Sequence, residues 1–193
     1  MLVSVRHLVD RWRHPRSRAD ELASLRARFA AQPGRFGASA PERALALELR
    51  ARRGALAAAF GQLAACRSCA RGRPLPAGRW PGGACCGART LDLFSPDEVG
   101  ALKLGGTRAA ALEPPRGDHA GCAFRGAEGC TLAPEDRPNV CVRYVCLELR
   151  RELHARPDWW AVARQARDLG ATFERFCAAR RPPERPWDEL RHG

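Results

Sequence analysis

Eight of the nine cysteines lie between residues 66 and 146, and the ninth, Cys177, stands alone. Buried thiols with no shared role would be scattered along a chain, so this clustering needs a chemical cause. The two standard causes are metal binding and disulfide formation. Disulfide frameworks belong to secreted chains, but the N-terminus lacks the continuous apolar segment of a secretory signal. We therefore expect a cytoplasmic protein whose reduced cysteines bind metal.

No apolar run is long enough to cross a bilayer, so no membrane association is expected. The best candidate, residues 54–66, is short, rich in alanine and interrupted by Gln62. The net charge is +12 and comes almost wholly from arginine, since Lys103 is the only lysine. Such a charge can attract nucleic acid or acidic surfaces, and it can also balance thiolates bound to a metal.

Composition divides the chain into three parts. Residues 1–65 carry apolar side chains at helical spacing and are expected to form a helical segment. Residues 66–150 are expected to form a cysteine-cluster metal-binding domain, and residues 151–193 a helix followed by a tail rich in proline and arginine. The expected fold is mainly α with a small irregular or β-containing, cysteine-rich metal-binding core. In chain order it has N-terminal helices, a loop-rich centre with a short hairpin, and a C-terminal helix.

The boundaries of individual elements follow from caps and breakers. Three helices are predicted in the first part, at 5–12, 17–31 and about 40–65, with Ser39 as a cap of the third. Glycine and proline predict a loop over residues 66–90. Ser95 and Glu98 have the spacing of a capping box. The later elements are expected to be a short strand at 91–94, a helix at 96–103 ending at Gly105-Gly106, two strands within 122–132, a helix at 141–153, and a helix at 159–179 capped by Asp158.

The cysteine spacing is suited to thiolate ligation of metal. Cys66 and Cys69 form a C-x2-C pair, whose sulfurs can both lie about 2.3 Å from one ion, and a tetrahedral site needs a second pair. Cys85 and Cys86 are adjacent and point in opposite directions in an extended segment, so we expect them to serve different ions, or only one to ligate. The remaining candidate ligands are Cys122, Cys130, Cys141 and Cys146. Eight sulfurs suffice for two four-ligand sites, one polynuclear cluster, or one site with spare thiols.

The C-x2-C pair has a redox alternative. A thioredoxin-like pair follows a strand and opens a helix, whereas Cys66 follows an alanine-rich helical segment and Cys69 precedes Gly-Arg-Pro-Leu-Pro. Zinc and iron both accept all-thiolate sites. The usual ferredoxin spacings are absent, which favours zinc, although an iron–sulfur cluster assembled from distant segments stays open.

The order of these motifs resembles a bacterial cysteine-cluster family described as zinc- or iron-chelating and called YkgJ-like or CxxCxxCC. The resemblance covers residues 66–146 and implies a metal or iron–sulfur centre without implying a reaction. Fifteen residues, 70–84, separate C-x2-C from CC, where the family has a much shorter spacer. The matching residues are Cys66, Cys69, Cys85, Cys86, Asp97, Glu98, Cys122, Phe124, Cys130, Leu132, Arg137, Pro138, Cys141, Tyr144 and Cys146.

Three functions are compatible with the sequence. The leading one is a non-enzymatic protein that binds zinc or iron. The second is an iron–sulfur redox component or enzyme, although no catalytic motif is found and no catalytic residue is assigned. The third is a basic nucleic-acid-binding protein that uses arginines such as Arg11, Arg13, Arg16 and Arg18.

A few other side chains have expected roles. His119 is a weaker candidate ligand near Cys122, and Cys177 is expected to pack as a small hydrophobe. Phe124 and Tyr144 are expected to shield the sulfurs from water. The remaining expectation is that Trp159 and Trp160 anchor the last helix to the core.

Overall fold

The computed structural model describes residues 18–60, 73–75, 78–80, 90–114, 122–126 and 129–181, and this part is mainly α, as predicted. The long helices are α2 (Arg18–Ala31), α3 (Ala40–Phe60) and α9 (Trp159–Arg180). The shorter helices are α5 (Thr90–Leu93), α6 (Pro96–Leu104), α7 (Asn139–Arg143) and α8 (Leu147–His154), with 3-10 turns η1 (Arg35–Gly37), η3 (Ala109–Ala111) and η4 (Pro134–Asp136). Two antiparallel strand pairs complete it: β1 (Arg73–Leu75) with β2 (Gly78–Trp80), and β3 (Arg125–Gly126) with β4 (Gly129–Cys130).

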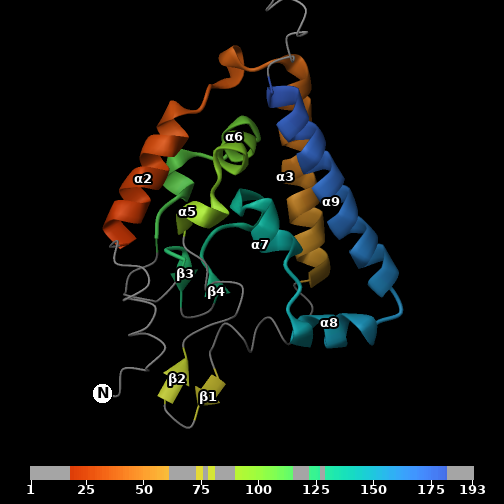
Figure 1. Ribbon diagram of the computed structural model, residues 1–193. Helices are drawn as coiled ribbons and strands as arrows, with labels where there is room; N and C mark the ends of the chain where they lie inside the picture. Colours follow the sequence, from red (N-terminus) through yellow and green to blue (C-terminus); the bar gives the residue numbers. More distant parts are fainter. Residues whose placement is uncertain are drawn as a thin grey trace, which may run out of the picture.

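The helices enclose the central elements from two sides (Figure 1). Helices α3 and α9 run antiparallel along one side, and α2 stands on the other. Helices α5, α6 and α7 lie between them, with β3 and β4 below. In the described residues, no helix is long and apolar enough to cross a membrane.

Two groups of buried side chains hold this arrangement together. The first, which we call the α3–α9 core, includes Leu49, Leu56, Leu169 and Phe176. The second, which we call the cysteine-side core, joins α2 and α5 to residues 122–132. Its members include Leu25, Phe29, Phe94, Leu112, Cys122, Phe124 and Leu132.

Helix α6 separates the two cores and contributes to both. Ala101 and Leu104 pack in the α3–α9 core, whereas Val99 and Leu102 pack in the cysteine-side core. A helix that buries residues around most of its circumference belongs in the centre of a domain. The position of α6 therefore determines where the two cores lie relative to each other.

Glycine lets α6 approach α3 closely. A Cβ atom at Gly105 would lie 2.9 Å from the backbone oxygen of Ala101 and 3.0 Å from that of Ala46, in α3. The next residue, Gly106, has φ +102°, which ends the helix in a conformation that L side chains rarely adopt. The predicted end of this helix at Gly105-Gly106 is therefore confirmed, with a packing reason added.

Of the three predicted N-terminal caps, Asp158 precedes α9 but its side chain makes no capping hydrogen bond. The other two caps are present, but they differ. At α3 the backbone N–H of Glu42 donates to Ser39 Oγ at 3.3 Å, and the N–H of Ser39 donates to Glu42 Oε2 at 2.6 Å. At α6 the N–H of Glu98 donates to Ser95 Oγ at 3.2 Å. The carboxylate of Glu98 is directed elsewhere, to another helix, so only half of the second capping box forms.

Two sequence predictions are wrong about the type of secondary structure. Residues 91–93 of the expected strand at 91–94 belong to α5, and the N–H of Phe94, which follows the helix, donates to Thr90 O at 3.0 Å. Burial of Thr90, Leu93 and Phe94 follows a helical period rather than the alternation of a strand. In residues 66–90, expected as loop, the described part contains β1 and β2.

The helix expected at 141–153 is two helices. Tyr144 leaves the helical conformation (φ −68°, ψ 122°), and Cys146 then caps α8, with its Sγ accepting from the N–H of Leu149 at 3.4 Å. The two strands expected within 122–132 are confirmed as β3 and β4. The helix expected at 5–12, the residues 61–65 expected to extend α3, and the tail lie outside the described residues.

Replacing Gly105 by alanine should lower the free energy of unfolding by about 1–3 kcal/mol, because the new methyl group meets two backbone oxygens that cannot easily move. The matched control is Gly54→Ala in α3, where nothing lies within 4 Å of the added Cβ. That change should raise the free energy of unfolding by about 0.5–1 kcal/mol, since alanine is the better helix former. Urea unfolding of both variants tests the close packing of α3 and α6, and equal effects would contradict it.

Candidate metal centre

Three of the predicted ligands lie at the cysteine-side core. Cys122 is buried within it, and Cys130 and Cys141 are partly buried and pack against it. They come from the segment before β3, from β4 and from α7, so three separate stretches of chain bring a thiol to one core. The other predicted donors on the N-terminal side lie outside the described residues, namely Cys66, Cys69, Cys85, Cys86 and His119.

Aromatic side chains make this core apolar. Phe124 is fully buried, and its ring centroid lies 5.3 Å from that of Phe94. Its burial beside Cys122 agrees with the predicted shielding role. Tyr144, expected to do the same, is 47% exposed. Phe94 and Phe124, rather than Tyr144, therefore make the surroundings of Cys122 apolar.

Side-chain hydrogen bonds fix the backbone next to Cys122. The N–H of Ala123 donates to Thr90 Oγ at 2.9 Å, and the N–H of Thr90 donates to Glu21 Oε2 at 3.0 Å. Thr90 thereby connects the Cys122 segment to α5 and to α2. Because both bonds are buried, their loss would leave unpaired polar groups.

Arg137 connects the strand pair to α7. Its Nε donates to Leu132 O at 2.9 Å and its Nη2 donates to Cys130 O at 3.3 Å. Pro138 follows and starts α7, which carries Cys141. Arg137 therefore holds the backbone of Cys130 beside the start of the helix that carries Cys141.

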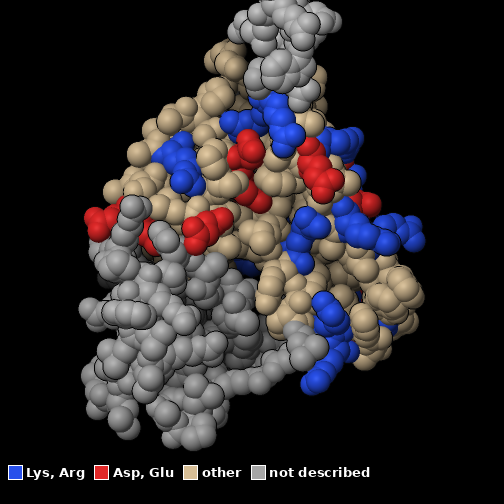
Figure 2. All heavy atoms as spheres, viewed as in Figure 1, with Lys and Arg blue, Asp and Glu red and all other residues tan. Residues whose placement is uncertain are grey.

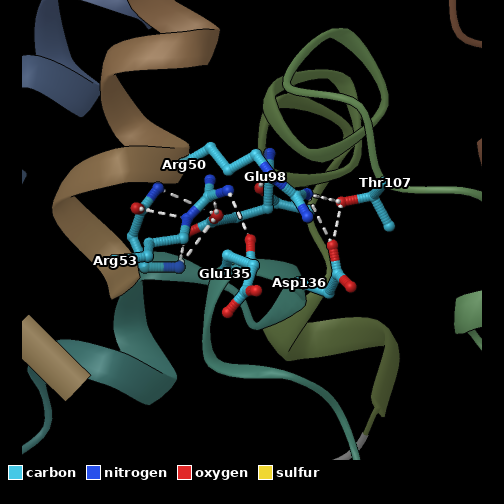
Figure 3. Close-up of polar contacts among 8 residues, drawn as sticks. Arg50, Arg53, Glu98, Thr107, Glu135 and Asp136 are labelled. Atoms are coloured by element: carbon cyan, nitrogen blue, oxygen red, sulfur yellow. Dashed lines mark hydrogen bonds and ion pairs between the residues drawn. The ribbon is translucent and has the colours of Figure 1, made fainter. Parts of the chain in front are cut away.

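The start of α7 is held by Glu98 (Figure 3). Its two carboxylate oxygens each accept from the backbone N–H of Asn139 at 3.0 Å, and Oε2 also accepts from the Asn139 side-chain amide at 3.0 Å. A carboxylate at a helix N-terminus binds free N–H groups and favours the positive end of the helix dipole. Glu98 of α6 thus caps α7 across the interior, which explains why it does not complete its own capping box.

Arg53 of α3 joins the same group. Its side chain has no exposed surface, its Nη2 lies 3.8 Å from Glu98 Oε2, and its Nε donates to Asn139 Oδ1 at 3.0 Å. Its Nη1 donates to the backbone oxygen of Glu135 at 3.4 Å. One buried ion pair therefore connects α3, α6 and α7.

Burial dominates the electrostatics of this pair. It lowers the pKa of Arg53 to about 10, although Glu98 opposes that change. Burial likewise raises the pKa of Glu98, against the attraction of Arg53 and the hydrogen bonds from Asn139. A buried pair of this kind contributes little net stability, but removing one partner leaves a buried charge without compensation.

A second ion pair borders the first on the side of η4. Arg50 donates to Asp136 Oδ1 at 2.8 Å, and the hydroxyl of Thr107 donates to the same oxygen at 2.7 Å (Figure 3). Together the two pairs line the contact of α3 with the segment that leads into α7. This contact turns α7 so that Cys141 packs against the cysteine-side core.

Asp97, beside Glu98, is directed to α9. The Nε of Arg180 lies 3.5 Å from its Oδ1, and Arg180 Nη2 donates to Gln32 Oε1 at 2.7 Å. Cys177 packs against the α3–α9 core, as predicted for a small hydrophobe. Burial, and then the charge and hydrogen bond of Asp97, raise the pKa of the Cys177 thiol to about 11. Cys177 is thus a protonated structural thiol.

The structure separates Cys146 from the other described candidates. Cys146 packs against the α3–α9 core, whereas Cys141 packs against the cysteine-side core. Among the residues that the structure describes, no three cysteine, histidine, aspartate or glutamate side chains form a group that could hold a metal ion. The described cysteines therefore do not form a metal site by themselves.

The sequence did not predict that Arg53 and Asn139 contact Glu98, or that Asp97 pairs with Arg180 of α9. One signal was available for Arg53. It occupies the apolar stripe of α3, between Leu49 and Leu56, where a charged residue is unexpected unless it is paired.

No family model, no curated protein and no solved structure matches this chain.

Replacing Glu98 by alanine should lower the free energy of unfolding by about 3–5 kcal/mol, because Arg53 is left buried without a counter-charge and α7 loses its cap. The control is the neighbouring carboxylate, Asp97, which is about half exposed. Asp97→Ala should cost less than about 1 kcal/mol. Urea unfolding followed by circular dichroism compares them, and a similar cost for both variants would show that the buried pair is unimportant.

The raised pKa of Cys177 predicts slow alkylation. At pH 8 its thiolate fraction should be about 100-fold below that of an ordinary cysteine, since its pKa is about 11 instead of 9.0. The iodoacetamide rate at this residue, followed by peptide mass spectrometry, should rise about tenfold per pH unit up to pH 10. Asp97→Asn should accelerate it. Because the folded thiol holds its proton more tightly than the unfolded one, Cys177 stabilisation should decline as pH rises above 9. A rate that levels off near pH 9 would contradict the assignment.

Proposed function

We propose that this protein binds zinc or iron through thiolates of its cysteine cluster, Cys66, Cys69, Cys85, Cys86, Cys122, Cys130, Cys141 and Cys146. The observation that carries the proposal is the position of Cys122, Cys130 and Cys141, which pack at one core from three separate segments. Thiolates gathered from distant parts of a chain are the donor set of structural zinc and iron–sulfur sites. Because the described residues hold no complete site, the remaining ligands would come from the other cysteines.

Chain connectivity favours Cys85 and Cys86 as the nearest of these. Cys86 precedes Thr90 by four residues, and four residues span at most about 14 Å. Thr90 accepts a hydrogen bond from Ala123, the neighbour of Cys122. The sequence separation therefore allows Cys86 to supply a ligand at the cysteine-side core. Cys146, at the other core, would belong to a different ion or a different part of a cluster.

The residues around the proposed ligands suit a structural metal. Arg137 and Glu98 fix the backbone beside Cys130 and Cys141, and Phe124 shields the core from water. Groups that orient ligands and exclude solvent tune a metal site as strongly as the ligands themselves. The resemblance to the YkgJ-like family rests on the same motif residues and supports the same function. The metal would supply cross-links between segments in addition to their apolar contacts.

Protein purified without oxygen should contain a stoichiometric amount of zinc or iron by elemental analysis. Replacing Cys122 or Cys141 by serine should reduce the metal content strongly, because each change removes a thiolate. Cys177→Ser is the matched control, since Cys177 lies outside the cluster and is held protonated, and it should retain the metal of the parent protein. A visible spectrum separates the two metals: an iron–sulfur cluster absorbs and bleaches on reduction, and zinc is colourless.

A chelator should also weaken the fold, with loss of helical circular dichroism and of protease resistance in residues 66–146. Metal-free protein, or equal metal loss in Cys177→Ser and Cys141→Ser, would reject the proposal. So would unchanged protease resistance after chelation.

A further inference from the structure

The corner between α8 and α9 carries a row of three rings. The ring centroids of His154 and Trp159 are 4.5 Å apart, and those of Trp159 and Trp160 are 3.4 Å apart in a stacked arrangement. Trp159 packs against the α3–α9 core, as predicted, whereas Trp160 is 61% exposed. An exposed tryptophan with one face stacked presents its other face to a ligand.

Arginines extend from this row along α9. Arg164 and Arg167 follow Trp160 by four and seven residues, so all three lie on one face of the helix. They are about 6 Å and 10 Å from Trp160 along the helix axis. Both arginines are exposed, and neither forms an ion pair within the described part of the chain.

Helix α8 adds exposed Arg150 and Arg151, and the charged atoms visible over α8, at the lower right of Figure 2, are blue.

The acidic side chains near this corner are engaged elsewhere. Asp158 accepts from Arg156 Nη2 at 2.5 Å and from its Nε at 2.8 Å. Asp168 lies 3.8 Å from Arg52 of α3, and Glu152 adds its charge to that of Asp158 around Arg156. Arg164 and Arg167 therefore place positive charge beside an open aromatic face, with no ion-pair partner among the described residues.

We propose that this corner binds single-stranded nucleic acid, with a base stacked on Trp160 and with Arg164 and Arg167 in contact with phosphates. Stacking on an aromatic ring combined with a basic track is the usual mode of single-strand binding, and it tolerates any base. A duplex hides the faces of its bases, so it can use only the arginines. A membrane surface would need an apolar helix face, but the apolar face of α9 is buried in the α3–α9 core.

Fluorescence anisotropy of a short labelled oligothymidylate, measured with the full-length protein over a salt series, tests this proposal. Trp160→Ala should weaken binding about 5- to 150-fold, the range for loss of one stacked base. Arg164→Gln/Arg167→Gln should lower the slope of log K against log salt by about 0.7 for each phosphate that the variant no longer binds. Binding of the corresponding duplex should be weaker and insensitive to Trp160→Ala.

Matched controls distinguish binding at this corner from nonspecific attraction of nucleic acid to the positively charged protein. Arg26→Gln/Arg108→Gln removes two exposed arginines far from the corner, and Phe36→Ala removes another exposed ring. Both should leave the affinity within about twofold of the parent protein. Equal weakening by the control arginines, or unchanged binding by Trp160→Ala, would overturn the proposal. It would also be overturned if Trp160→Ala abolished binding to phosphatidylserine vesicles but not to the oligonucleotide.

Discussion

The described structure depends on one buried carboxylate. Glu98 lies on α6, the helix shared by both cores, and accepts the first N–H groups of α7 while facing Arg53 of α3. A charge in this position is costly unless it is paired and hydrogen-bonded. Its pairing thus selects one arrangement of three helices, and that arrangement determines which core Cys141 approaches. The neighbouring carboxylate, Asp97, forms an ion pair with Arg180 at the end of α9.

Local signals predicted most of the helices because their information lies within the helix itself. Ser39 and Ser95 cap where expected, and Gly105-Gly106 ends α6 as expected. The errors arose where the deciding contacts are distant in sequence. Apolar and polar residues alternate in Leu91-Asp92-Leu93, as they do in a strand. In the structure Thr90 is hydrogen-bonded to both Glu21 and Ala123 and is buried as part of α5. No proline or glycine in the sequence marks the end of α7 at Tyr144. The structure shows it, because Cys146 caps a new helix there.

The sequence suggests the candidate ligands, but it does not predict the residues that surround them. Cysteine spacing predicts Cys122, Cys130 and Cys141 as ligands, because clustered thiols have few other uses. Their common core, and the separation of Cys146 from it, depend on tertiary packing. Asn139 and Arg137 gave no sign of their roles as partners of Glu98 and of the β4 backbone. The corner at Trp160 was not predicted, because a Trp-Trp pair suggests that both rings pack in the core. In the structure Trp159 is partly buried against the α3–α9 core, and Trp160 is exposed.

We propose that sulfur atoms from several segments of the chain converge on a bound metal. X-ray absorption at the zinc or iron edge of the intact protein, purified without oxygen, measures the neighbours of that metal. We expect sulfur neighbours at about 2.3 Å, with four per metal ion when every ligand is a cysteine or a bridging sulfide. A metal surrounded only by oxygen and nitrogen, or the absence of any bound metal, would contradict it.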